Sequence, residues 1–349
     1  MSLKADFLEL FALKDSPVRW PIALQAAVAM GLPTVGFALA GRGDLGLLAS
    51  SGAFIALYLT GRSRRDRALL LPLIGAGLIL ASVLGVLASG SLALSLTALF
   101  LVVVVSSVLC LGFSVGPPGV LFFVLVTGVS SHLAAAPALE GAGLPGGLVV
   151  GMLSVGVVIA YAVVLVPLVL PRVRARDAAH HSARTVMTFE IDEVTRIIIV
   201  RLIVACGVAA LVAAPLGIHR AYWVLIAVVA ILQNGHRFRL TALRGAHRVL
   251  GTLAGLGLFA LLSLLHPSGV WLGLVLAALQ FLVEIVVIRN YGLALFFITP
   301  LALTIAAQGR TGEVGAIVVD RVVDTVLGAG IAFLILLIAL GISKVRPRQ

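Results

Sequence analysis

Long apolar runs constrain this chain more than any other feature of its sequence. They recur from Trp20 almost to the C-terminus and are about 17–25 residues long, the length at which a helix crosses a bilayer's hydrocarbon core. Only 11% of the 349 residues are charged, whereas a soluble globular chain carries roughly 25%. The short alternating segments of a membrane β-barrel are absent. We therefore predict an all-α, polytopic membrane protein whose main partner is the lipid bilayer.

The apolar runs fall into two groups of six, separated by a polar stretch from Pro171 to about Ile198. We expect about twelve membrane helices, at 20–41, 46–61, 68–89, 92–112, 119–137, 147–170, 201–217, 222–235, 249–265, 270–288, 291–308 and 322–342.

The two groups resemble each other in sequence at an offset of 174 residues. The aligned pairs are Gly61 with Gly235, Gly77 with Gly251, Phe122 with Phe296, Phe123 with Phe297 and Arg172 with Arg346. With six crossings each, the halves enter the membrane from the same side, so we predict two parallel six-helix repeats with a site at their interface. The expected divisions are an amphipathic interfacial segment at 1–17, a first repeat at 18–171, a cytoplasmic linker at 172–198, a second repeat at 199–344 and a cytoplasmic tail at 345–349.

The formal charge of +11 follows the positive-inside rule. With both termini and the linker in the cytoplasm, 21 of the 25 Lys and Arg residues lie on the cytoplasmic side. This bias orients a multi-pass protein of the cell's inner membrane, and it accounts for most of the charge without nucleic acid as a partner.

The sequence offers little for catalysis or cofactor binding. No nucleotide-binding loop of the GxxxxGK[ST] type occurs, and no soluble catalytic constellation is evident. Cys110 and Cys206 lie inside apolar runs, where free cysteines behave as small buried hydrophobes. The adjacent His180 and His181 point apart on a helix, which disfavours a metal site. We expect neither an enzyme nor a bound cofactor or metal.

Charged residues at membrane depth are costly and are therefore functional candidates. Glu284 has two interpretations: a structural ion pair, for example with Arg248, or a carboxylate that exchanges protons or faces substrate. Asp320 and Asp324 share a helix face, and Asp320 suits a helix N-terminus. Asp324 lies a turn deeper and could pair with Arg321. Glu284, Asp324 and Asp320 are thus the candidates for proton coupling.

Basic residues near the cytoplasmic ends of the second group form a collar that would gather anions. These residues are Arg244, Arg248 and Arg289; their alternative role is topological anchoring. Gly251 and Gly255 follow in a GxxxG spacing, which permits tight helix packing.

Two runs, 46–61 and 222–235, are shorter than the roughly 20 residues that a spanning helix needs. They occupy matching places in the two halves, which in repeat transporters points to the binding site. The residues expected to contact substrate there are Ser50, Ser51, Gln233 and Asn234, with Glu284 close by.

Four segments of the second half resemble the fusaric acid resistance family, which includes aromatic acid exporters and has plant malate channels as distant relatives. These are the runs Ala221–Asn234, Arg244–Gly255, Arg289–Pro300 and Asp320–Gly328. The resemblance implies a membrane protein that exports organic anions, often aromatic carboxylates. Many members carry a large cytosolic domain between their membrane halves, whereas only about 27 residues intervene in this chain.

The favoured function is proton-coupled efflux of a small organic anion. A passive anion channel and a non-transporting scaffold in envelope biogenesis remain alternatives, and homo-oligomerisation is left open. Saturable, pH-coupled flux would indicate a transporter and unitary conductance a channel, whereas a scaffold would show neither.

Overall fold

A computed structural model describes residues 9–17, 19–179, 187–235, 238–307 and 314–345 of the chain. Within these ranges the chain is built from helices joined by short connections, and it contains no β-strand. The expected all-α class is confirmed. His180 and His181, at which the sequence disfavours a metal site, lie outside the described residues.

The first half contains six principal helical segments. They are α2 (Trp20–Leu39), α3 (Gly43–Ser50) with its 3-10 continuation η1 (Ser51–Leu57), α4 (Arg64–Ala88), α5 (Leu92–Gly112), α6 (Leu121–Ala134) and α7 (Gly146–Leu165), which ends in η3 (Val166–Val169). The short α8 (Pro171–Ala179) leads out of this half.

The second half also contains six principal helices. Its helices are α9 (Glu193–Ala213), α10 (Ile218–Leu232), α11 (Phe238–Leu264), α12 (Gly269–Val286), α13 (Tyr291–Ala307) and α14 (Val314–Val345). Each of the twelve predicted segments overlaps one of these helices.

Eight of the described helices are long and apolar enough to cross a membrane, which defines a multi-pass membrane protein. Four apolar helices are shorter: Gly43–Leu57, Leu121–Ala134, Arg220–Leu232 and Tyr291–Ala306. These short helices are the second and the fifth of each half.

Corresponding helices make corresponding contacts. The first and second helices of each half pack together (α2 with α3, α9 with α10), as do the third and fifth (α4 with α6, α11 with α13). The sixth helix lies against the second and third in both halves, with α7 on η1 and α4, and α14 on α10 and α11.

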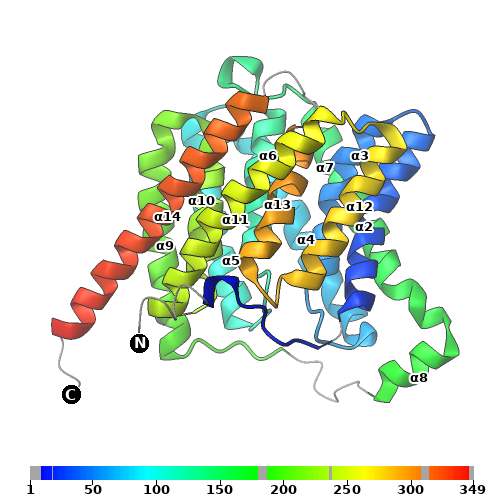
Figure 1. Cartoon of the computed structure of the whole chain (residues 1–349), viewed down its shortest axis with the longest axis horizontal. Coiled ribbons are helices and arrows are strands. Elements are labelled where there is room, and N and C mark those ends of the chain that lie inside the picture. Colours follow the sequence, from blue (N-terminus) through cyan, green and yellow to red (C-terminus); the bar gives the residue numbers. More distant parts are fainter. Residues whose placement is uncertain (1–8, 18, 180–186, 236–237, 308–313, 346–349) are drawn as a thin grey trace.

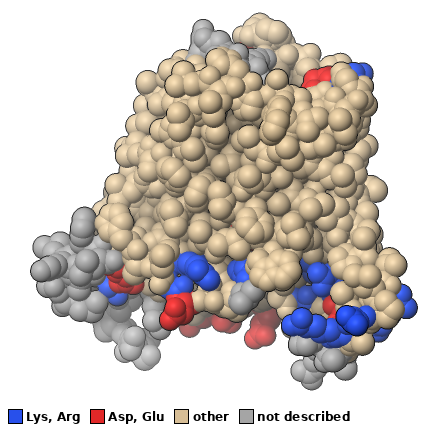
Figure 2. All heavy atoms as spheres, turned by 45° about the vertical axis from the view of Figure 1, so that its right-hand side comes forward, with Lys and Arg blue, Asp and Glu red and all other residues tan. Residues whose placement is uncertain are grey.

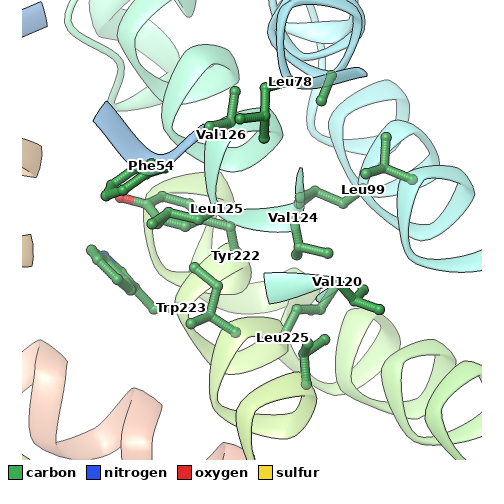
Figure 3. Packing of buried hydrophobic residues seen from close by; sticks show 14 of the residues in the cluster. Phe54, Leu78, Leu99, Val120, Val124, Leu125, Val126, Tyr222, Trp223 and Leu225 are labelled. Atoms are coloured by element: carbon green, nitrogen blue, oxygen red, sulfur yellow. The ribbon is translucent and has the colours of Figure 1, made fainter. Parts of the chain in front are cut away.

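Three helix pairs provide the largest contacts between the halves. The first helix of each half packs on the fourth of the other, as α2 on α12 and α5 on α9, and α6 packs on α10. In Figure 1, α2 and α12 lie side by side at the right, and α9 and α14 lie at the left. The largest apolar cluster surrounds α6. Figure 3 shows Leu125 and Val126 of α6 among Leu78 of α4 and Tyr222 and Trp223 of α10.

Charge is concentrated at one end of the bundle. The N-terminal segment, α8 and the Val345 end of α14 all lie at the lower end in Figure 1. Figure 2 shows Lys and Arg side chains gathered along this end and a broad uncharged band above it. We call it the basic end, defined by the exposed residues Arg65, Arg172, Arg174 and Arg289. An uncharged band of this kind suits the hydrocarbon layer.

Three helices of the second half begin at least two turns earlier than the sequence pattern indicated. α9 begins at Glu193 instead of 201, α11 at Phe238 instead of 249, and α14 at Val314 instead of 322. In each case the extra turns carry charged residues, which hydropathy assigns to loops. A helix satisfies its own backbone hydrogen bonds and continues through such turns wherever its charged side chains find water or partners.

The N-terminal segment differs from the amphipathic helix expected over 1–17. In its described part only residues 9–11 are helical, and residues 12–17 have no regular structure. This stretch lies across the first turns of α11 and the start of α13. Asn290 donates to the carbonyls of Leu10 (2.9 Å) and Ala12 (3.1 Å), and the Lys14 amide donates to the Arg289 carbonyl (3.1 Å). We call residues 9–17 the strap.

Candidate functional site

A cavity of about 490 Å³ lies between the two halves. All four short helices contribute to its wall, as do α11, α12, α14 and the loop at Pro117 and Pro118. Its volume is typical of a small-molecule site. Apolar side chains form most of the wall, and the rings of Phe54 and Phe122 stack within it, with centroids 4.2 Å apart.

The charged residues of this central cavity are mostly basic. Arg19, Arg244, Arg248 and Arg321 line it together with a single carboxylate, Glu284, so the described lining carries a formal charge of +3. Uncompensated positive charge inside an apolar wall favours an anionic occupant, because apolar surroundings screen charges less than bulk water does.

Glu284 pairs with a residue that the sequence analysis did not consider. Its Oε2 lies 2.7 Å from Nη2 of Arg19, which precedes α2, and both side chains are largely buried. The predicted ion pair between Glu284 and Arg248 is therefore wrong. The pair joins the start of the first half to α12 of the second, across 265 residues of sequence. Gln280 approaches the other carboxylate oxygen at 3.5 Å.

Arg244 and Arg248 lie on α11, and only in part do they form a collar. Arg244 lines the cavity with its guanidinium over the Tyr291 ring (4.1 Å to the centroid), and its Nε donates to the Ala230 carbonyl (2.7 Å). Arg248 is 3% exposed, which places it inside the protein and away from the mouth. Its Nη1 lies 3.5 Å from the Tyr291 hydroxyl, and its Nε has no hydrogen-bond partner in the described ranges.

Asp324 and Asp320 bind Arg220 of α10. Nε of Arg220 donates to Asp324 (3.1 Å), and its Nη1 lies 3.2 Å from Asp320. The pairing of Asp324 with Arg321 expected from helical spacing is replaced by this contact between α10 and α14. Asp324 is buried, but neither aspartate is part of the described cavity wall. Arg321 lies on the cavity side, its guanidinium 3.7 Å from the centroid of the Trp223 ring.

The predicted polar contacts divide between two places. Gln233 and Asn234 line the central cavity, where Gln233 Oε1 accepts from the Val120 amide (3.1 Å). Ser51 lines a small apolar cavity of about 30 Å³ that shares Phe54, Trp223 and other residues with the central one. Ser50 lines neither; it is fully buried, and its hydroxyl donates to the Leu47 carbonyl (2.7 Å).

A third cavity, of about 230 Å³, opens at the basic end. It shares Asn234, Arg244 and Tyr291 with the central cavity, and residues of the strap form part of its wall. Arg289 lies here, exposed, and donates to the Ser16 hydroxyl (3.0 Å). The central cavity therefore shares wall residues with both of the others. It lies between the cavity at the basic end and the small apolar cavity.

Several residues of this site were not predicted from the sequence. Arg19 entered there only as one of the 21 basic residues assigned to the cytoplasmic side. Trp223 and Tyr291 stand within the family-like runs and went unassigned. Arg321 was placed at an outer helix end, because the early start of α14 cannot be read from hydropathy. Among the described residues no cluster of His, Cys, Asp and Glu could hold a metal ion.

Membrane-length helices around a basic internal cavity define a polytopic membrane protein with a candidate anion site. Residues 204–335 match the family described as fusaric acid resistance protein-like, so the second half of the chain is similar to that family and the predicted resemblance is confirmed. The matched residues include α10, α11, α12, α13 and much of α14, which provide most of the cavity's polar wall.

Two curated relatives align with 136 residues, or 38% of this chain. YvaC of Bacillus subtilis (strain 168), an uncharacterized membrane protein, is 39% identical over a stretch that makes up 22% of its length. YhfK of Escherichia coli (strain K12), an uncharacterized protein, is 34% identical over 19% of its length. The match thus spans about a fifth of each relative. No solved structure matches the chain.

Proposed function

We propose that this protein moves a small organic anion across the membrane through the central cavity. The observation that carries the proposal is the lining itself: four arginines face one glutamate in a space of about 490 Å³ with mostly apolar walls. Such a wall suits a molecule that combines an anionic group with an apolar body. Export as the direction, and a carboxylate as the anionic group, follow the family resemblance.

We infer that the path lies between two parallel six-helix repeats that cross the membrane twelve times. The matching helix contacts in the two halves support this, as do the short second and fifth helices, all four of which line the cavity. One detail agrees with the 174-residue offset. Arg67 donates to the Ala56 carbonyl and Arg244 to the Ala230 carbonyl, both at 2.7 Å, and these alanines are 174 positions apart.

In the proposed orientation the basic end faces the cytoplasm. Most Lys and Arg residues then lie inside, as the positive-inside rule requires. Anions would enter through the cavity that contains Arg289 and Arg244, pass to the central cavity, and leave beyond Trp223. The small apolar cavity there corresponds to a closed outer side.

Glu284 is the proposed coupling residue, because it is the acidic residue of the described cavity wall and its charge is balanced by Arg19. Protonation of Glu284 would release Arg19, which could then interact with the transported anion. Asp324 and Asp320 are weaker candidates, since both are engaged by Arg220.

Flux measurements in proteoliposomes test the proposal. The purified full chain should transport radiolabelled benzoate at pH 8 above the leak of empty liposomes, and the flux should saturate. Unlabelled benzoate should compete, whereas the uncharged isostere benzamide should not. An imposed pH gradient should drive accumulation in the wild type but not in Glu284→Gln, whose benzoate binding should persist.

Matched variants and electrical recordings distinguish a transporter from a channel and from a protein that transports no organic anion. Arg244→Gln with Arg248→Gln should lower flux, most strongly at low ionic strength, while Arg172→Gln, at an exposed position of α8, should not. Unitary currents would assign the protein to the channels. Absence of flux for benzoate and malate alike would refute organic-anion transport.

A further inference from the structure

Arg321 is the most unusual charged residue of the central cavity. It lies within the first turns of α14, is 4% exposed, and lines the cavity. Its Nε and Nη1 are buried and have no hydrogen-bond partner among the described residues. Leaving buried donors of a charged group unsatisfied is costly, so such donors normally meet a partner.

In the part of the chain that the structure describes, the carboxylates on the neighbouring helices do not fill this role. Asp324, three residues further along α14, is within electrostatic reach of Arg321, but its carboxylate accepts from Arg220. Asp320 also pairs with Arg220. Glu284, the carboxylate in the cavity wall, is paired with Arg19. The carboxylate of Asp324 therefore compensates the positive charge of Arg321 only in part. The Nε and Nη1 donors of Arg321 remain available to a ligand.

Trp223 fixes the orientation of the guanidinium. The Arg321 Cζ lies 3.7 Å from the indole centroid, so the flat face of the guanidinium is covered by the ring. A guanidinium's N–H bonds lie in its plane, and stacking leaves that edge available for hydrogen bonds. The stack thus holds a planar fork of donors in place before any ligand arrives, which lowers the entropy cost of binding.

A second arginine lies within reach. Arg248 on α11 interacts electrostatically with Arg321, and so does Tyr291 of α13, and both line the same cavity. Arg248 also has an unpartnered Nε. Two like charges held near each other in an apolar surrounding repel, and an anion placed between them relieves that repulsion.

We infer that Arg321 binds the carboxylate of the transported anion, with Arg248 as its second donor and Trp223 as a positioning residue. The inference rests on the proposed transport function and identifies the anion-binding residues within it. The apolar body of the ligand then lies against the wall that contains Phe54, Phe122 and Leu125.

Equilibrium binding to the purified full chain in detergent tests this, with radiolabelled benzoate in a scintillation proximity assay. The wild type should bind benzoate saturably, with competition by unlabelled benzoate, weak competition by chloride and none by benzamide. Arg321→Gln should weaken binding by about tenfold or more, since a charge-assisted, bidentate contact is lost. Arg321→Lys, which keeps the charge but not the planar fork, should fall between the two. Arg172→Gln, on exposed α8, is the matched control and should bind as the wild type does.

The variants also separate failure of this assignment from failure of the proposed function. If Arg321→Gln does not fold, as judged by size-exclusion chromatography, Arg321→Lys provides the test. Wild-type affinity in the folded Arg321 variants, in a protein that transports benzoate, would overturn the assignment alone. A wild type that neither binds nor transports benzoate or malate would overturn the proposed function, and the assignment with it.

Discussion

Two glycines on α11 meet opposite surroundings. A Cβ on Gly255 would lie 2.8 Å from the Thr299 Cβ and 2.9 Å from the Leu295 and Phe296 carbonyl oxygens, whereas one on Gly257 would meet nothing within 4 Å. Gly255 therefore sets how closely α11 approaches α13, as the GxxxG spacing predicts.

Gly255→Ala should destabilise the protein by about 1–3 kcal/mol, since the backbone of α13 cannot yield without separating the helices. Gly257→Ala, two residues away on the same helix, should be close to neutral. Thermal unfolding in detergent compares the two. Equal melting temperatures for the two variants would contradict the tight approach seen at Gly255.

The Arg19–Glu284 pair lends itself to a double-mutant test. Arg19→Leu leaves Glu284 buried without its partner and should cost about 3–5 kcal/mol. Arg19→Leu with Glu284→Leu removes both charges and should recover most of that loss, because no lone charge remains. Thermal unfolding of both single variants and the double variant measures the coupling. A double variant that is less stable than either single one would show that the pair is not the main interaction of these residues.

At the scale of elements, two arginines cap the C-terminal end of the short helix α10. Arg201 of α9 donates to the Leu232 and Gly235 carbonyls, and Arg244 donates to the Ala230 carbonyl. The last carbonyls of a helix lack partners within it, and in a membrane they need other donors. Side chains from two neighbouring helices thus allow α10 to stop short and leave room for the cavity.

The strap depends on Asn290, which has two separable roles. Its Nδ2 donates to Leu10 and Ala12, while its Oδ1 accepts from the Leu293 amide at the start of α13. Asn290→Asp keeps the acceptor and removes the donors. We expect this variant to release the strap while α13 stays capped, so trypsin should cleave after Lys14 several-fold faster, as local opening becomes easier.

Asn290→Ala is the comparison, because it loses both roles and should lower the melting temperature as well as speed cleavage. Mass spectrometry of the fragments identifies the site. Unchanged cleavage after Lys14 in both variants would mean that the remaining contacts hold the strap without Asn290.

For the whole molecule, the distribution of charge predicts orientation. In a chain without Cys110 and Cys206, a cysteine at residue 175 on α8 should react with an impermeant maleimide only after cells are opened, because the basic end faces the cytoplasm. A cysteine at the exposed position of Arg42, near the opposite end, should react in intact cells. The reverse labelling pattern would overturn the proposed topology, and with it the proposed direction of transport.

The helices could be predicted from the sequence and the pairing of their charges could not. Every predicted segment overlaps a helix of the structure, because apolar composition and helical hydrogen bonding depend on neighbouring residues. The starts of α9, α11 and α14 were misplaced where charged turns continue a helix. Gln233, Asn234 and Arg248 were predicted as candidates and line one cavity. The first two were found because the short runs marked the place where the halves face each other, and Arg248 was found from the cluster of basic residues.

The sequence alone determined the class of the chain, the number of its apolar segments and the bias of its charge, because hydropathy and net charge are properties of short stretches. Only the tertiary structure decided which charges meet. Glu284 binds Arg19 across 265 residues, Asp324 binds Arg220, and Arg321 is left facing the cavity over Trp223. An ion pair depends on distances of a few ångströms between side chains, and these distances are set by how the helices pack against one another.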